Sequence, residues 1–101
     1  MNGIESIGAE RLRQIREEGF DPSHDDQHAK GEIASAALCY VWSAMTGLHQ
    51  MTPPRAPTWW PWAQRWWKPK GRREDLVRAG ALIAAEIDRL DRAAAMGGEA
   101  P

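Results

Sequence analysis

The segment 58–73, TWWPWAQRWWKPKGRR, restricts the fold of this chain more than any other. It holds five of the six tryptophans, which are Trp59, Trp60, Trp62, Trp66 and Trp67. Each indole offers about 150–250 Å² of surface, and at about 25 cal/mol per Å² five rings left in water would forgo on the order of 20 kcal/mol. That exceeds the whole stability of a typical small domain. The rings therefore cover a small helical core, or some of them face a planar anionic ligand.

The charge of this region favours a ligand for part of it. Residues 55–73 carry six Arg or Lys side chains and no acid, whereas residues 1–32 hold eight acids against four bases. The net charge is −1, which argues against a partner such as long nucleic acid. Indoles stack on bases and Arg pairs with phosphate, so we predict a nucleotide-like small molecule. The candidate ligand-binding residues are Trp66, Trp67, Lys68, Arg72, Arg73, His24 and Trp42.

Two helices are predicted at the ends of the chain. Asn2 and Glu5 have the spacing of a capping box, which starts a helix at residues 3–18. A second helix at residues 72–95 carries acids in its first turn, where the helix dipole favours them. Its apolar stripe consists of Leu76, Val77, Gly80, Ile83, Ala84, Ile87 and Leu90. Glycine costs about 1 kcal/mol there relative to alanine, so we expect a neighbouring helix to approach Gly80 closely.

A long middle helix is predicted at residues 23–48. Ser23 and Asp26 form a second capping signature, and the apolar positions from Ile33 to Leu48 define a wide face. The opposite arc gathers polar and reactive groups, among them Cys39 and Ser43.

The remaining segments complete an all-α fold. Five prolines between residues 49 and 71 prevent a continuous helix, so this segment is expected to be an ordered crossover loop held by its indoles. Residues 96–101 are expected to be a flexible tail. The predicted single domain, residues 1–101, is a helical hairpin with an additional N-terminal helix. Because one short helix and a loop do not cover both apolar stripes, we predict a homodimer.

Asp25, His28 and Glu32 are the candidate metal ligands. They stand at i, i+3 and i+7, a spacing that places the three side chains on one face of the predicted middle helix. Carboxylate and imidazole groups at this spacing can share Mg²⁺ or Mn²⁺, with Asp75 or Glu86 completing the site from another helix. The alternative is that Asp25 and its neighbour Asp26 serve the helix N-terminus.

Cysteine content and hydropathy indicate the cellular compartment in which the chain is expected. Cys39 is the one cysteine, so no intrachain disulfide forms, and a reducing cytoplasm is the expected setting. No apolar run approaches the length of a membrane span, and the N-terminus lacks a signal-peptide pattern. His28 stands nearly three turns from Cys39 on the predicted middle helix, too far to act as its base, so the thiol is expected to be inert packing.

Four runs carry a resemblance: ERLRQIREEG, HDDQHAKGEIASAALCY, WPW with WWKP, and RREDLVRAGALIAAEIDRLDR. Over about residues 9–92 the chain resembles small uncharacterised phage and prophage proteins, which implies the cytoplasm of a bacterial host. More distantly, residues 31–34 and 76–87 resemble MazG-like all-α nucleotide pyrophosphohydrolases, which hold magnesium with an EExxE motif and a later ExxD. Glu32 matches one carboxylate of the first motif, its partners are missing, and nothing matches the second.

Three functions remain open on these observations. The first is a phage-type protein that binds a nucleotide-like molecule without turning it over and sequesters a host immune signal. The second is a metal-dependent nucleotide pyrophosphohydrolase. The third is a protein-interaction module that inhibits a host enzyme, with the tryptophans as interface anchors.

Overall fold

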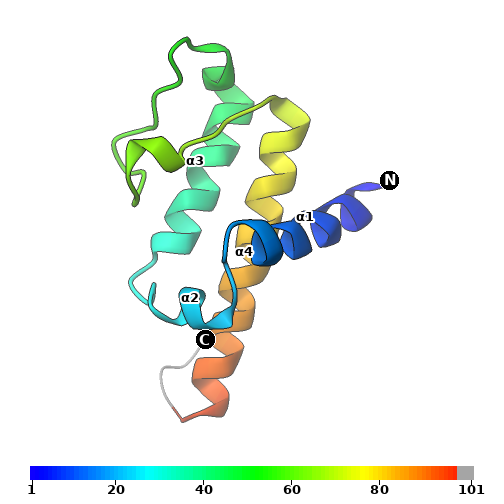
Figure 1. Ribbon diagram of the computed structural model, residues 1–101, viewed down its shortest axis with the longest axis vertical. Helices are drawn as coiled ribbons and strands as arrows, with labels where there is room; N and C mark the ends of the chain where they lie inside the picture. The colour runs from blue at the N-terminus through cyan, green and yellow to red at the C-terminus, as the bar shows by residue number, and fades with distance from the viewer. Residues whose placement is uncertain (98–101) are drawn as a thin grey trace.

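The computed structural model describes residues 1–97, and within them every regular element is helical (Figure 1). The predicted all-α fold, with its hairpin, N-terminal helix and ordered crossover, is confirmed. Residues 98–101, most of the predicted tail, lie outside the described residues. The elements are α1 (Gly3–Glu17), α2 (Pro22–Asp26), α3 (Glu32–Thr46), the 3₁₀ turns η1 (Leu48–Gln50) and η2 (Gln64–Trp66), and α4 (Arg72–Ala95). None of the described helices is long and apolar enough to cross a membrane.

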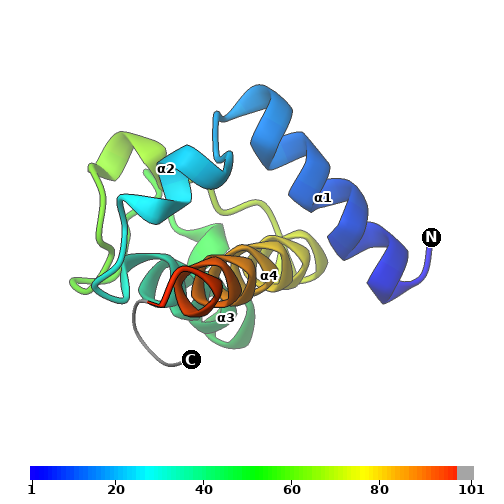
Figure 2. The same ribbon diagram turned by 90° about the horizontal axis from the view of Figure 1, so that it is seen from below.

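Helices α3 and α4 form the centre of the molecule and run side by side (Figure 1). Small side chains, Ala36, Ala37, Ala79 and Ala85, are buried between them and allow the helix backbones to approach closely. Helix α1, α2 and the tryptophan loop, which we define as residues 51–71, all lie on one side of this pair (Figure 2).

Helix α1 begins where its sequence predicts. The Asn2 side chain accepts a hydrogen bond from the Glu5 N–H, and the Glu5 carboxylate accepts one from the Asn2 N–H, both at 2.9 Å. Helix α1 then crosses α4 at Gly80, where a Cβ would lie 2.6 Å from Ile7 Cδ1. The expected close approach at Gly80 is therefore confirmed, with α1 as the neighbouring helix.

The predicted middle helix at residues 23–48 is wrong, because the chain forms two helices there. Asp21 caps α2 by accepting a hydrogen bond from the His24 N–H at 2.9 Å, and Pro22 occupies its first turn. The helix ends at Asp26, and Gly31 with a φ of 87° precedes α3. Such a left-handed backbone favours glycine and separates the directions of the two helices.

The apolar stripe on α4 is only partly covered within one chain. Leu76, Ile83 and Ile87 are exposed, while Asp75, Arg78 and Arg89 are buried on the same helix. On α3, Leu38 and Met45 of the predicted apolar face are likewise exposed. Its Cys39 and Ser43, from the arc predicted to be polar, are fully buried instead.

The tryptophan loop is ordered by contacts with α3 and α4. Its Trp67 ring is buried and stacks on Tyr40 with a centroid distance of 4.7 Å. Where the loop meets α4, the buried Asp75 accepts hydrogen bonds from the Lys70 N–H and the Ser43 hydroxyl, both at 2.8 Å. The Asp75 carboxylate thus holds the C-terminal end of the tryptophan loop.

Candidate functional site

A cavity of about 520 Å³ lies between α1, α2, the tryptophan loop and the α3–α4 pair. We call it the Trp cavity. Its aromatic lining comes from three parts of the chain and consists of Phe20, Tyr40, Trp60, Trp62 and Trp66, with the imidazoles of His24 and His28. Its charged lining consists of Glu10, Arg13, Glu18, Lys68 and Arg78. Planar apolar surfaces and charged groups therefore meet in one concave site.

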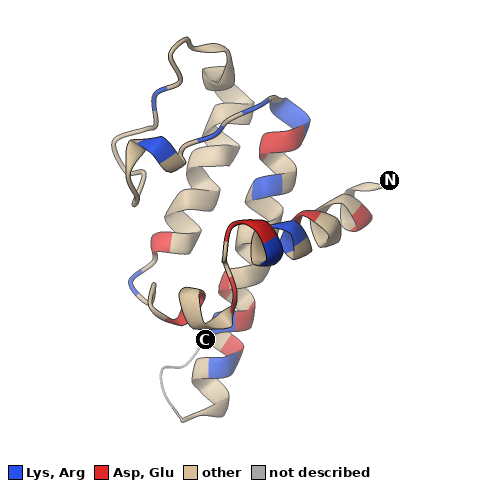
Figure 3. Cartoon of the chain, in the orientation of Figure 1, with Lys and Arg blue, Asp and Glu red and all other residues tan. Residues whose placement is uncertain are grey.

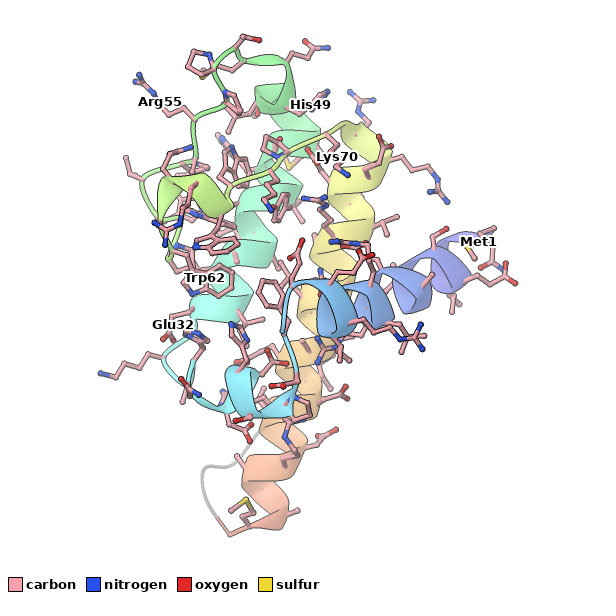
Figure 4. All side chains as sticks on the ribbon, in the orientation of Figure 1. Met1, Glu32, His49, Arg55, Trp62 and Lys70 are labelled. Carbon is pink, nitrogen blue, oxygen red and sulfur yellow. The ribbon has the colours of Figure 1, made fainter. Side chains whose placement is uncertain are left out.

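The rings form a continuous chain along one wall of the Trp cavity. Phe20 stacks on His24 at 4.7 Å, and His24 in turn lies 4.7 Å from His28. His28 meets Trp62 edge-on at 5.5 Å, and Trp62 meets Trp60 at 5.4 Å. Trp62 reaches from the loop toward the segment that holds α2 and the start of α3 (Figure 4). The break between α2 and α3 is what brings both imidazoles to this wall.

On α1, Glu10 and Arg13 are fixed by each other. Arg13 donates to both Glu10 oxygens, at 2.7 and 2.8 Å, and to Glu18 at 2.9 Å. Burial would raise the pKa of Glu10, but the bonds and charge of Arg13 and the charge of Arg78 outweigh it and lower that pKa. The bond to Glu10 raises the pKa of Arg13. Both groups are therefore ionised at neutral pH.

Arg78 and Lys68, the other two cations of the Trp cavity, differ in whether protein oxygens bind them. Arg78 is buried, donates to the Lys68 carbonyl at 2.6 Å and lies 4.0 Å from Glu10. Lys68 is exposed, and its ammonium lies 5.4 Å from the Trp66 ring centroid, a cation–π distance. Within residues 1–97 no carboxylate pairs with Lys68, so its charge is available to a ligand.

The predicted ligand-binding residues separate into two groups. Trp66, Lys68 and His24 line the Trp cavity. Trp67 belongs to the core instead, because its ring is buried and stacks on Tyr40. Trp42 packs against Trp59 at 5.9 Å and does not line the cavity.

The two arginines at the start of α4 also lie apart from the Trp cavity. Arg73 donates to the Ser6 hydroxyl at 2.7 Å and so joins α4 to α1. Arg72 is exposed and is not among the residues that line the cavity. The combination of Trp66 and Lys68 with Arg72 and Arg73 in one cleft is therefore not formed.

The predicted metal ligands are not brought together. Asp25 is buried on α2, where it binds Arg11 at 2.8 Å and His24 at 2.9 Å. His28 Nδ1 lies 3.4 Å from the Glu32 carboxylate, and hydrogen bonds from the backbone N–H groups of Glu32 and Lys30 hold the pKa of the Glu32 carboxyl below its ordinary value. Across residues 1–97 no three His, Cys, Asp or Glu side chains gather as a metal-binding group. The helix break removed the single-helix spacing on which the prediction depended.

The two residues expected to complete a metal site are engaged elsewhere. Asp75 lies at the end of the tryptophan loop with Ser43 and Lys70, and Glu86 is hydrogen-bonded to Arg89 at 2.7 and 3.0 Å. Cys39 agrees with its expected packing role, since it is fully buried and burial raises the pKa of its thiol to about 11.

Several lining residues were not predicted, and one signal could have found them. Glu10, Arg13 and Gln14 line the Trp cavity, and their spacing places them on one face of α1 together with the buried Ser6. Gln14 is buried, its Nε2 lies 3.4 Å from the Glu10 carboxylate, and its Oε1 has no partner. The buried Trp62 Nε1 has none either. Unpaired buried groups cost about 1–3 kcal/mol each, which favours their satisfaction by a rearrangement or a ligand.

The acidic segment that leads into α2 and the basic tryptophan loop occupy different parts of the molecule, as the sequence predicts, whereas α1 and α4 carry both charges (Figure 3). Acids gather around the end of α1 and the segment that leads into α2, and bases lie along the tryptophan loop and at the start of α4. The Trp cavity lies where these two regions meet. Comparisons of the chain with protein-family models, with curated proteins and with solved structures find no match.

Proposed function

We propose that the protein binds a nucleotide-like small molecule, a planar heteroaromatic group with one or two negative charges, in the Trp cavity. The observation that carries this proposal is the meeting of three indoles with the unpaired Lys68 in one cavity of about 520 Å³. Ligand sites typically have volumes of about 300–1,000 Å³, with mostly apolar walls and a few polar groups that set orientation.

The charges of the lining limit the ligand. Three cations and two carboxylates leave an excess of one positive charge when both imidazoles are neutral. Arg13 and Arg78 are held by protein oxygens, so Lys68 is the group that meets an anion. A polyphosphate needs more free cations than this, and we propose a monophosphate or carboxylate instead.

We further propose that the ligand is held without being turned over. Such a protein withdraws its ligand from solution, which is a sequestering role. Two observations support this choice over a hydrolase. Among the described residues the carboxylates near the cavity pair with arginines instead of gathering for a metal, and the buried Cys39 thiol does not line the cavity.

Isothermal titration with a panel of nucleoside monophosphates and heteroaromatic carboxylates tests the proposal. Trp66→Ala and Lys68→Met are expected to weaken binding by about tenfold or more, because stacking on an indole contributes about 1–3 kcal/mol. Trp59→Ala and Lys70→Met are the matched controls, since both side chains are exposed and neither lines the Trp cavity. The controls are expected to bind as the wild type does.

Three results would contradict the proposal. One is an absence of binding across the panel at millimolar ligand. Another is an equal loss in the Trp66 and Trp59 variants, which would place the effect outside the Trp cavity. The third is release of phosphate or pyrophosphate from a bound nucleotide with Mg²⁺ or Mn²⁺, which would support the hydrolase.

A further inference from the structure

The side of the α3–α4 pair that faces away from the Trp cavity is apolar and uncovered. Helix α1, α2 and the tryptophan loop lie on the other side, and no described residue covers this one (Figure 2). Four large side chains lie on it with exposed fractions of about one half or more: Leu38 55%, Met45 68%, Ile83 47% and Ile87 52%. Monomeric proteins rarely expose contiguous apolar patches larger than a few hundred Å², and larger ones mark interaction sites.

The shape and spacing of this surface fit another helical pair. A groove of about 270 Å³ runs between the two helices, lined by Ala34, Ala37, Leu38, Val41, Ile83, Glu86 and Ile87. Along α3 the outward positions are 34, 38, 41 and 45, and along α4 they are 83, 87, 90 and 94. Alternating steps of four and three are the spacing with which helices interdigitate in bundles and coiled coils.

The charge of the groove fits a second copy of the same chain. In a two-fold interface each patch meets itself, so any unpaired charge on it would meet a like charge. Glu86 is the one charged residue in the lining, and Arg89 already donates two hydrogen bonds to it. A charged partner would find no free opposite charge here, whereas an identical apolar face is complementary.

We propose that two copies of this chain associate through this face, so that α3 and α4 of each copy pack as a four-helix arrangement. A stable interface takes about 800 Å² from each partner. The four large side chains and the alanines between them supply the apolar centre of such an area. The inference is independent of the ligand, because the Trp cavity lies on the other side of the α3–α4 pair and stays open in the dimer.

Sedimentation equilibrium of the full chain tests the dimer and its surface. The wild type is expected to show twice the 11.3 kDa mass of one chain at micromolar concentration. Leu38→Glu and Ile83→Glu are expected to weaken self-association by at least tenfold, because two-fold symmetry buries each new charge twice. The matched control is Leu12→Glu on α1, where the wild-type leucine is 51% exposed and lies off this face. It is expected to remain dimeric.

The proposal is overturned if the wild type sediments as a monomer up to millimolar concentration, a result that depends on no variant. It is equally overturned if Leu38→Glu and Ile83→Glu keep their helical circular dichroism and associate as the wild type does. Selective loss of association in Leu12→Glu would move the interface to α1 and also reject this face. The nucleotide titrations are unaffected by these outcomes, since a monomer retains the Trp cavity.

Discussion

At the scale of single residues, Glu10 links two helices through two arginines. It accepts hydrogen bonds from Arg13 on its own helix and lies 4.0 Å from Arg78 on α4. The folded protein holds the pKa of Glu10 below its ordinary value of 4.5. A carboxyl whose pKa is lowered by folding stabilises the folded state above its ordinary pKa, and this stabilisation is lost as the pH falls through the lower folded value.

Glu10→Gln is therefore expected to reduce the free energy of unfolding at pH 7. The difference from the wild type should shrink as the pH falls below about 4.5, because the wild-type carboxyl then takes up a proton. Urea unfolding of both proteins from pH 7 to pH 3 measures this. Glu17→Gln is the control, since Glu17 is an exposed partner of the same Arg13 and exposed pairs contribute at most about 1 kcal/mol. A difference between wild type and Glu10→Gln that is constant across this pH range would refute the assignment.

The sequence predicts part of the candidate site at this scale. Trp66, Lys68 and His24 are predictable because aromatic and basic residue types carry their own chemistry. For Glu10 and Arg13 residue type favours a solvated face instead, since charged residues on a helix usually lie in water. Their burial depends on partners that other helices bring, which residue type alone does not reveal.

At the scale of elements, the contact between α1 and α4 depends on Gly80. A Cβ at this position would lie 2.6 Å from Ile7 Cδ1 and 2.8 Å from its Cγ1. Alanine in a helix interior is about 1 kcal/mol more favourable than glycine, but an extra methyl in a well-packed contact costs about 1–3 kcal/mol. The packing cost therefore exceeds the gain in helix propensity at Gly80.

Gly80→Ala is expected to lower the free energy of unfolding by about 1 kcal/mol on this balance. Gly8→Ala on α1 is the matched control, because a Cβ there would meet no atom within 4 Å, and it should raise stability by about 0.5–1 kcal/mol. Urea unfolding of both variants, and of Gly80→Ala combined with Ile7→Ala, measures the difference. The penalty at Gly80 should vanish once Ile7 is shortened. If Gly80→Ala stabilises as much as Gly8→Ala does, the close contact is not what requires glycine.

Helix existence was predictable from local signals, and helix continuity was not. The capping box at Asn2 and the start of α4 at Arg72 follow from neighbouring residues alone. Residues 23–48 also have a helical period, but the chain breaks there at Gly31. An isolated glycine lowers helix stability by only about 1 kcal/mol, so the break depends on what each part gains by packing separately. Here that gain is the packing of Phe20 and both imidazoles against Trp62.

The buried face of α4 illustrates a second limit. Hydrophobic periodicity ranked Ile83 and Ile87 above Arg78, yet Arg78 is the buried side chain. A buried cation is tolerated when its donors are satisfied, and Arg78 meets the Lys68 carbonyl, the Tyr40 hydroxyl and the ring of Tyr40. Leu76, Ile83 and Ile87 thereby remain on the surface, and Ile83 and Ile87 lie on the proposed interface.

At the scale of the whole molecule, several acids of the N-terminal third pair with arginines outside the tryptophan loop. Arg11 binds Asp25, Arg13 binds Glu10 and Glu18, and Arg92 of α4 binds Asp26. In the described part of the chain, the cations of the loop have no carboxylate partner. The loop therefore keeps a positive field beside the Trp cavity, and we expect this field to act on the proposed anionic ligand over a distance of about 10 Å at moderate salt.

The single core predicts that the loop and the helical hairpin unfold together. Cys39 is fully buried in one cluster with Trp67 of the loop and Leu82 of α4, and burial raises the pKa of its thiol to about 11. A disulfide reagent at pH 8 is therefore expected to label Cys39 only on unfolding, with the same urea midpoint as the helical circular dichroism. The control is Ser23→Cys in a Cys39→Ala background, an exposed position that should react at once without urea. Labelling of Cys39 at distinctly lower urea than helix loss would instead show that the tryptophan loop opens by itself, and the Trp cavity would then have to form anew each time the loop closes.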